Sequence, residues 1–197
     1  MAAAASAFTR TSVAPATLAL RGEHQVTNAI VAIRLLEAAR AAGMPISDAA
    51  INAGLTGAAW PARLEVLALE GPRRVLLDAA HNTEGAQALA AYLRRWHPER
   101  PPLVVGIMRD KDADDILHEL LPVTSTVIAT EAPTPRALPS AELAVKARAA
   151  GATDVRVNAD AAAAIDQALT LADTVCVAGS IFLAGAVRDG LKRRALA

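Results

Sequence analysis

Apolar and polar positions repeat with two different periods along most of the chain, and each change of period marks an expected boundary. Short runs rich in Val and Leu indicate strands, whereas apolar residues that recur every three to four positions indicate helices. From residue 63 onward the two patterns alternate regularly. The expected strands span residues 63–68, 75–77, 103–107, 126–129, 154–157 and 174–178. The expected helices of this part span residues 85–95, 113–121, 140–150, 161–171 and 181–192.

This alternation predicts the fold class. Strands that are apolar throughout are typical of a parallel sheet whose two faces are covered by helices. Short connections and right-handed crossovers then give an α/β fold with a Rossmann-like, doubly wound, mostly parallel sheet, which begins near Arg63. We place a domain boundary at the connector that ends in Trp60-Pro61, which gives domains of residues 1–60 and 61–197.

The first domain follows a helical pattern. Residues 17–20 indicate the end of a strand whose partners are absent. A helix then runs to about residue 42, with Ile30 and Leu35 in its apolar stripe and Gly43 as its stop signal. A shorter helix spans residues 45–54. This region therefore predicts a helical remnant ahead of the sheet.

The composition narrows the range of partners. The 197 residues include 20 Lys and Arg against 20 Asp and Glu, and only 3% are aromatic. A chain without basic excess has no electrostatic basis for binding nucleic acid or an anionic membrane surface. Scarce aromatic residues leave little surface for base stacking. We expect neither nucleic acid nor a membrane as a partner.

Cysteine usage and hydropathy indicate the compartment. Cys176 is the only cysteine, so no disulfide within the chain and no cysteine-based zinc site is expected. Residues 1–8 are rich in Ala but lack the basic start and the length of a secretory signal. The apolar stretch 175–187 is shorter than a membrane span. These features predict a soluble, cytoplasmic protein.

The candidate site lies where an apolar run ends in polar residues. Residues 75–77 are followed by Asp78, His81 and Asn82, and the helical pattern starts directly afterwards. In open α/β sheets, ligands bind at the carboxyl ends of the strands. Asp78 can accept hydrogen bonds from ribose hydroxyls, while His81 and the N–H groups of the next helix can face phosphate. The alternative is a capped turn, with Asn82 or Thr83 as the helix N-cap and Asp78 as a turn former.

Further polar residues follow the other expected strands. They are Arg109, Asp110, Lys111 and Asp112, then Glu131 and Arg136, and finally Gly179 and Ser180. Because carboxyl ends of parallel strands share one edge of a sheet, we expect a polar rim there. The proline-rich loop 131–139 is long enough to form a flap. None of the four histidines has metal-site spacing, so no metal site is expected.

Two side-chain amides in the first helix are a second candidate feature. Gln25 and Asn28 are three positions apart and share one helical face. Their amides can read the donor and acceptor edge of an adenine, or they form the polar first turn of an ordinary helix.

Several common site motifs are absent from the sequence. It has no Walker-type phosphate loop, and no Gly-x-Gly-x-x-Gly follows the first strand. Ser180 lies between an expected strand and helix, which suggests an α/β-hydrolase. Its surroundings are not Gly-x-Ser-x-Gly, and the chain order Asp78, His81, Ser180 differs from that family's order.

Five motifs occur together in an order that resembles a known family. They are Leu20 to Ala29, Trp60 to Glu65, Leu77 to Asn82, Val105 to Asp112 and Ala178 to Phe182. Over almost the whole chain they resemble the C-terminal part of the folylpolyglutamate synthase/dihydrofolate synthase branch of the Mur ligase superfamily. On this resemblance, the first domain is the end of the central ligase domain and the second is the C-terminal Rossmann-like domain.

The resemblance implies an ATP-dependent amide ligase. Such enzymes phosphorylate a carboxylate, here of folate or dihydropteroate, and the amino group of glutamate displaces the phosphate. By this resemblance Asn28 and Gln25 contact the adenine and Asp78 holds the ribose. Arg63 reaches the ATP phosphates, a role suited to a guanidinium fork, and His81 lies near the terminal phosphate.

The resemblance also implies residues that bind the incoming glutamate. Lys111 and Ser180 match positions that handle the carboxylate of the incoming amino acid. The family's phosphate loop and Mg²⁺ ligands lie upstream of the matching region, so we expect half of a catalytic site, inactive alone and completed by an upstream ligase half. Thr83 stands where the family usually has proline.

Two alternatives stay open. One is a non-catalytic Rossmann-like module that binds a nucleotide or a protein partner. The other is a Mur-type ligase half that acts on a peptidoglycan precursor or another acid.

Overall fold

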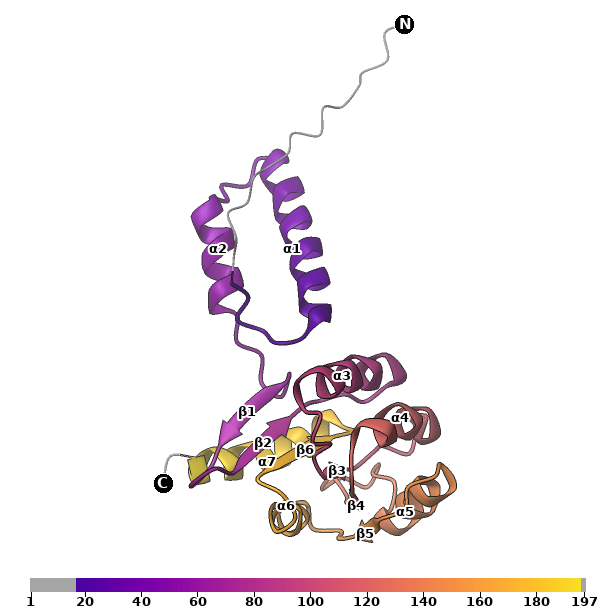
Figure 1. Cartoon of the computed structure of the whole chain (residues 1–197). Helices are drawn as coiled ribbons and strands as arrows, with labels where there is room; N and C mark the ends of the chain where they lie inside the picture. The colour runs from indigo at the N-terminus through magenta and orange to yellow at the C-terminus, as the bar shows by residue number, and fades with distance from the viewer. Residues whose placement is uncertain (1–16, 196–197) are drawn as a thin grey trace, which may run out of the picture. The chain divides into compact units, whose positions relative to one another are not determined.

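The computed structural model describes residues 17–195, and the chain divides into two compact units (Figure 1). The first, here called the helical unit, comprises the described residues 17–19 and 25–59. The second, here called the sheet unit, comprises residues 20–24 and 60–195. Part of the predicted first domain, residues 1–16, lies outside the described residues.

The helical unit contains α1 (Glu23–Ala41), whose first two residues belong to the sheet unit, and α2 (Asp48–Gly57). Gly43 follows α1 with a φ of 98°, the left-handed conformation that ends a helix. Ser47 caps α2 by accepting a hydrogen bond from the N–H of Ala50 at 3.1 Å. Both predicted helices are therefore confirmed, although α2 continues past its predicted end.

Two expectations for the helical unit are wrong. Residues 17–20 form no strand, because a strand persists only where another strand pairs with its backbone. Ile30 and Leu35, expected in a buried stripe, are 54% and 66% exposed. Two helices bury too little of each other's surface to cover such a stripe.

The sheet unit is built on six strands in the order β1-β2-β6-β3-β4-β5. Their bounds are β1 (Glu65–Ala68), β2 (Arg74–Leu77), β3 (Leu103–Val105), β4 (Val127–Ala129), β5 (Val155–Val157) and β6 (Thr174–Ala178). Only the pairing of β1 with β2 is antiparallel among these strands, and every other pairing is parallel. The predicted Rossmann-like, mostly parallel sheet is confirmed.

Helices cover both faces of this sheet (Figure 1). One face carries α3 (Thr83–Trp96), α4 (Ala113–Leu120) and α5 (Ser140–Ala149), with a short 3₁₀ turn η1 (Leu121–Val123) after α4. The other face carries α6 (Ala161–Leu169) and α7 (Ile181–Ala195). Successive strand residues point to opposite faces, so Cys176 packs in one core and Val177 in the other.

The first strand of the sheet starts later than its pattern predicts. The pattern predicts a strand from residue 63 that includes Arg63 and Leu64, yet β1 begins at Glu65. Ala62 and Leu64 have φ values of 54° and 48°, which a strand does not allow. Arg63 therefore lies in a turn ahead of the sheet.

The proline-rich loop 131–139 is held against the sheet unit, so the predicted flap is wrong. The N–H of Leu138 donates to the carbonyl of Ile107 at 2.8 Å. One carboxylate oxygen of Glu131 accepts from both the N–H and the hydroxyl of Ser140, each at 2.8 Å. Its apolar residues supply the physical reason, since Ala132 and Leu138 are buried in the core.

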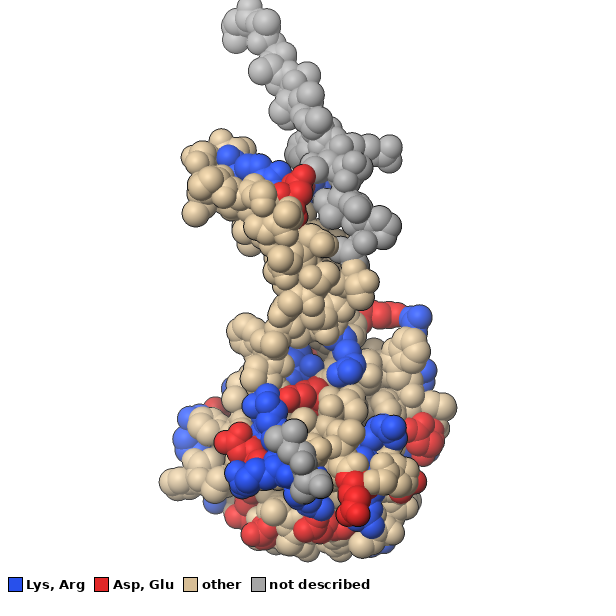
Figure 2. Space-filling model, turned by 90° about the vertical axis from the view of Figure 1, so that its left-hand side faces the viewer, with Lys and Arg blue, Asp and Glu red and all other residues tan. Residues whose placement is uncertain are grey.

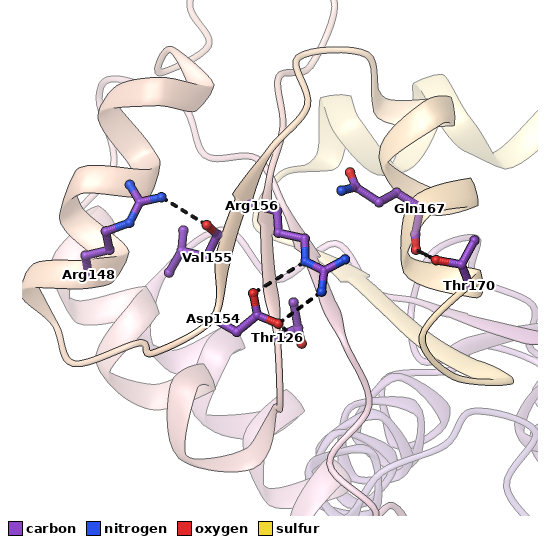
Figure 3. A network of polar contacts seen from close by, with 7 residues as sticks. All are labelled: Thr126, Arg148, Asp154, Val155, Arg156, Gln167 and Thr170. Carbon is purple, nitrogen blue, oxygen red and sulfur yellow. Dashed lines mark hydrogen bonds and ion pairs between the residues drawn. The ribbon is translucent and has the colours of Figure 1, made fainter.

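Polar contacts fix the edge strand β5 at its amino end, away from the candidate site (Figure 3). Asp154 accepts a hydrogen bond from the Thr126 hydroxyl at 2.9 Å and pairs with Arg156. Arg148 of α5 donates to the carbonyl of Val155 at 2.9 Å. Figure 3 also shows the Thr170 hydroxyl donating to the Gln167 carbonyl at the end of α6.

Charges of both signs are interspersed on the face of the sheet unit that Figure 2 shows, and the helical unit there is mainly uncharged. Such a mixture produces no extended field of one sign on that face. Between residues 17 and 195, no helix is both long and apolar enough to cross a membrane.

Candidate functional site

A cavity of about 540 Å³ lies in the sheet unit at the carboxyl end of β2. The turn before β1, the start of α3 and the first half of α7 form its walls. Its charged and imidazole side chains are His24, Arg63, Asp78, His81, Glu84 and Arg188. The fold thus brings Arg63, from the turn before β1, beside Asp78 and His81, which both follow β2.

Asp78 follows β2 directly, and both its carboxylate oxygens accept backbone hydrogen bonds. The N–H of Leu64 donates to one oxygen and the N–H of Ala80 to the other, each at 2.8 Å. Burial raises the pKa of Asp78, and these two N–H groups and the Arg63 guanidinium oppose that rise. A carboxylate offers about four acceptor positions, so one hydroxyl of a ligand can still be bound.

His81 stands at the turn between β2 and α3, with one ring nitrogen already engaged. The carbonyl of Ala79 lies 2.8 Å from Nδ1, and a carbonyl only accepts, so Nδ1 carries the proton and donates. The Nε2 atom remains for a ligand. Directly after it, Asn82 caps α3 by accepting from the N–H of Gly85 at 2.9 Å. Helix geometry leaves the N–H groups of this first turn without intrahelical partners, which makes it an anion-binding position.

Arg63 is exposed at the rim of this cavity. Its guanidinium carbon lies 5.8 Å from the centre of the Trp60 ring, within cation–π range. The backbone on either side of Arg63 is held by its neighbours Ala62 and Leu64, which are buried and hydrogen-bonded. Because Arg63 is exposed and lines the cavity, its charge is available to a ligand there.

Three of the six charged and imidazole lining residues, His24, Glu84 and Arg188, were not among the predicted site residues. His24 lies 2.6 Å from where a side chain on Gly22 would begin, and burial and the charge of Arg63 lower its pKa. Arg188 of α7 pairs with Glu65 of β1 across 123 residues. The Gly-Glu-His triplet offered a weak signal for His24, but the polar residues of a C-terminal helix gave none for Arg188.

Gln25 and Asn28, the two residues predicted to contact adenine, lie in the helical unit. Gln25 and Asn28 share one face of α1 as expected, and the Asn28 amide donates to the Gln25 side-chain oxygen at 3.1 Å. Their contact with adenine stays a prediction.

Lys111 and Ser180, the two residues predicted to bind the incoming glutamate, do not line this cavity. The hydroxyl oxygen of Ser180 accepts from the N–H of Phe182 at 3.0 Å, so Ser180 acts as the cap of α7, and it is 1% exposed. Lys111 follows β3, with its ammonium 3.8 Å from an oxygen of Asp110. Their role in substrate binding also stays a prediction.

A second cavity, of about 550 Å³, lies between α6 and α7 on one face of the sheet. Asp160, Asp189 and Arg193 are among its lining residues, which include none of the predicted site residues. Within residues 17–195, no group of three or more His, Cys, Asp or Glu residues could hold a metal ion.

Comparison with protein families gives one matching model, the Mur ligase glutamate ligase domain, over residues 62–181. The dihydrofolate synthase/folylpolyglutamate synthase of Mycobacterium tuberculosis is 35% identical over 191 residues, which cover 87% of this chain and 39% of that protein. The chain thus spans about two fifths of that relative's length.

Among the solved structures that resemble the chain are two nucleotide-bound synthases. The M. tuberculosis folylpolyglutamate synthase complexed with ADP and AMPPCP has a TM-score of 0.79 and 36% identity, covering 88% of this chain and 41% of that one. The bifunctional synthase from Yersinia pestis complexed with AMPPNP and Mn ion has a TM-score of 0.66 and 28% identity, covering 76% of this chain and 35% of that one.

Proposed function

The chain belongs to the Mur ligase family, and on that premise we propose that it is the nucleotide-binding C-terminal portion of a ligase that joins glutamate to folate or dihydropteroate at the expense of ATP. The relatives named for this activity are more than twice as long as the matching region. The activity, the substrates and an upstream ligase half are therefore parts of the proposal.

One observation carries the proposal. Arg63, Asp78 and His81 converge on one cavity at the carboxyl end of β2, beside the start of α3. A guanidinium, a hydrogen-bonded carboxylate and a helix start suit the phosphates and the ribose of a nucleotide. The solved relatives bound to ADP, AMPPCP and AMPPNP are consistent with a ligand of this class.

Each residue has a defined part in this proposal. Asp78 accepts a hydrogen bond from a ribose hydroxyl, and Arg63 binds the phosphates and stabilises charge while the phosphoryl group moves. His81 presents Nε2 near the terminal phosphate. Lys111 and Ser180 hold the carboxylate of the incoming glutamate, and Gln25 and Asn28 contact the adenine. Any Mg²⁺ is held by residues outside the described part of the chain, and no step of this proposal passes through it.

A non-catalytic nucleotide-binding module is the second candidate. It is favoured by the lack of a metal-binding cluster among residues 17–195 and of a Walker-type loop in the sequence. Both candidates require nucleotide binding, but only the first requires turnover.

Binding and turnover together test the proposal. We expect the chain to bind ATP more tightly than adenosine. Arg63→Ala is expected to lower the affinity for ATP about tenfold and to leave the affinity for adenosine unchanged. ADP formation is then measured with Mg²⁺, glutamate and dihydropteroate or a reduced folate. We expect none from the chain alone and turnover after the upstream part of the M. tuberculosis relative is added. Nucleotide binding without any turnover in that mixture would favour the non-catalytic module.

A further inference from the structure

Arg63 is held between two residues whose backbone conformation is unfavourable. Ala62 and Leu64 have φ values of 54° and 48°, in the left-handed region. For residues other than glycine this conformation costs about 1–2 kcal/mol each. Such a turn persists only where surrounding contacts hold it, so the position of Arg63 depends on those contacts.

Every backbone polar group of these two neighbours has a partner. The N–H of Ala62 donates to Glu65 at 2.8 Å, and its carbonyl accepts from the N–H of Ala79 at 2.7 Å. The N–H of Leu64 donates to Asp78 at 2.8 Å, and its carbonyl accepts from Arg21 at 3.2 Å. Two side chains, those of Glu65 and Asp78, therefore fix the two N–H groups on either side of Arg63.

Glu65 is itself fixed by the C-terminal helix. Arg188 of α7 donates to both of its carboxylate oxygens, at 2.7 and 2.9 Å. The two side chains are only 19% and 21% exposed, so water screens the pair weakly. A bidentate guanidinium–carboxylate contact also fixes the orientation of the carboxylate, and with it the acceptor for the Ala62 N–H.

We infer that Glu65 and Arg188 are positioning residues, which hold the Ala62–Leu64 turn so that Arg63 faces the phosphates of the bound nucleotide. This inference rests on the proposed role of Arg63. It assigns a function in nucleotide binding to α7, whose Arg188 lies 123 residues from Glu65 in the chain.

Arg188 also lines the cavity, so a direct contact with phosphate is the competing explanation. The two explanations differ when Arg63 is absent. A positioning residue acts through Arg63, and its removal has no further effect once Arg63 has been replaced. A residue that touches phosphate contributes independently, and its loss adds to the loss of Arg63.

The experiment is a double-mutant cycle on the full chain, read as affinity for ATP and for adenosine. Arg188→Met keeps the apolar stem and removes the pair. We expect it to lower ATP affinity by about tenfold, the scale of one charge-assisted hydrogen bond, and to leave adenosine affinity unchanged. In the Arg63→Ala background, Arg188→Met is expected to cause no further loss. A purely structural role would lower both affinities together.

Two further variants keep the test decisive. Glu65→Gln retains an oxygen for the Ala62 N–H and is expected to give a smaller, equally phosphate-specific loss, which replaces Arg188→Met if that protein does not fold. Asp166→Asn is the matched control. It removes the acidic charge that pairs at 2.7 Å with Arg194, which lies on α7 like Arg188, and neither Asp166 nor Arg194 lines the cavity at β2. It is expected to leave both affinities unchanged.

Four results would overturn the inference, the first being an equal loss of ATP and adenosine affinity in Arg188→Met. Additive losses in the cycle would assign Arg188 a direct phosphate contact. Wild-type ATP affinity in both Arg188→Met and Glu65→Gln, with a loss in Arg63→Ala, would refute the positioning role alone. Wild-type affinity in Arg63→Ala would refute the proposed role of Arg63, and the positioning role with it.

Discussion

At the scale of single residues, Asp78 combines a structural task with its proposed contact to ribose. Its carboxylate oxygens accept backbone hydrogen bonds from the turn before β1 and from the turn after β2. Replacement of Asp78 therefore disturbs Leu64 and the neighbouring Arg63 as well as any ligand. Arg63→Ala is the cleaner probe of phosphate binding, because the Arg63 side chain is exposed.

Glu65 provides a residue-scale prediction on pH. Its hydrogen bonds from Arg188 hold the pKa of Glu65 below the ordinary value of 4.5, against the opposing effect of burial. The unfolded chain therefore binds more protons than the folded chain just below pH 4.5, and the free energy of unfolding falls as the pH falls through the folded pKa. We expect Glu65→Gln to cost about 2 kcal/mol at neutral pH and to lose less stability on acidification than the wild type.

Urea unfolding at a series of pH values measures this difference. The stability gap between wild type and Glu65→Gln should be constant above pH 4.5 and should narrow below it. Asp166→Asn serves as the control for a general effect of removing an acid. A gap that does not change with pH would mean that Glu65 titrates alike in the folded and unfolded chains.

Single residues also mark the limit of what the sequence predicts. Asp78 and His81 could be placed at a strand end because an apolar run stops there. The conformation around Arg63 could not be foreseen, since Ala62 and Leu64 are residues that normally avoid positive φ. Contacts with the neighbouring Glu65 and with Asp78, which comes from the segment after β2, help to make that turn stable.

At the scale of elements, the connection between β6 and α7 depends on a glycine. Gly179 has a φ of 106°, and a side chain there would begin 2.8 Å from the carbonyl oxygen of Gly106 and 2.9 Å from Val105. The first atom is backbone, and the second is a methyl group of Val105, whose β-branched side chain is stiff and fully buried. The close approach of β6 to β3 therefore requires glycine at this position.

Gly179→Ala is expected to lower the free energy of unfolding by about 3 kcal/mol, the sum of backbone strain and overpacking. Gly151→Ala is the matched control. Its φ of 99° carries the same strain, but nothing lies within 4 Å of the added carbon, so a loss of about 1 kcal/mol is expected. Urea unfolding measures both, and equal losses would contradict the role of the close approach.

Most elements followed from periodicity, whereas the connections did not. The bounds of β6 and the starts of α4 to α7 agree with the pattern because caps such as Asp112 and Asp160 coincide with it. The loop 131–139 departs from the prediction, because its proline content and length indicate a free flap. Its apolar residues are instead buried against the sheet.

At the scale of the whole molecule, the parallel sheet explains how distant residues meet. Strands β2 and β6 are neighbours although they lie far apart in sequence, so the segments that follow them, with Asp78 and with α7, share one edge. The resemblance of five motifs could indicate this arrangement before the structure did. The Arg188–Glu65 pair could not be derived that way, because it depends on the exact packing of α7 against β1.

Cys176 provides a prediction for the whole sheet unit. It lies at 0% exposure in the inner strand β6, and burial raises the pKa of its thiol. A thiol reagent should therefore label the folded chain slowly and the urea-unfolded chain rapidly. Ser125→Cys, at an exposed position, is the control and should react at once. Fast labelling of Cys176 without urea would mean that β6 opens in the native state.

The most direct test of the proposed site is to locate bound ADP on the chain by backbone amide NMR. We expect the largest chemical-shift changes at residues 62–64 and 78–85, around the cavity at the carboxyl end of β2. The cavity between α6 and α7 has a similar volume and serves as an internal comparison. Shifts confined to that second cavity, or no saturable shifts at all, would contradict the assignment of Arg63, Asp78 and His81 to nucleotide binding.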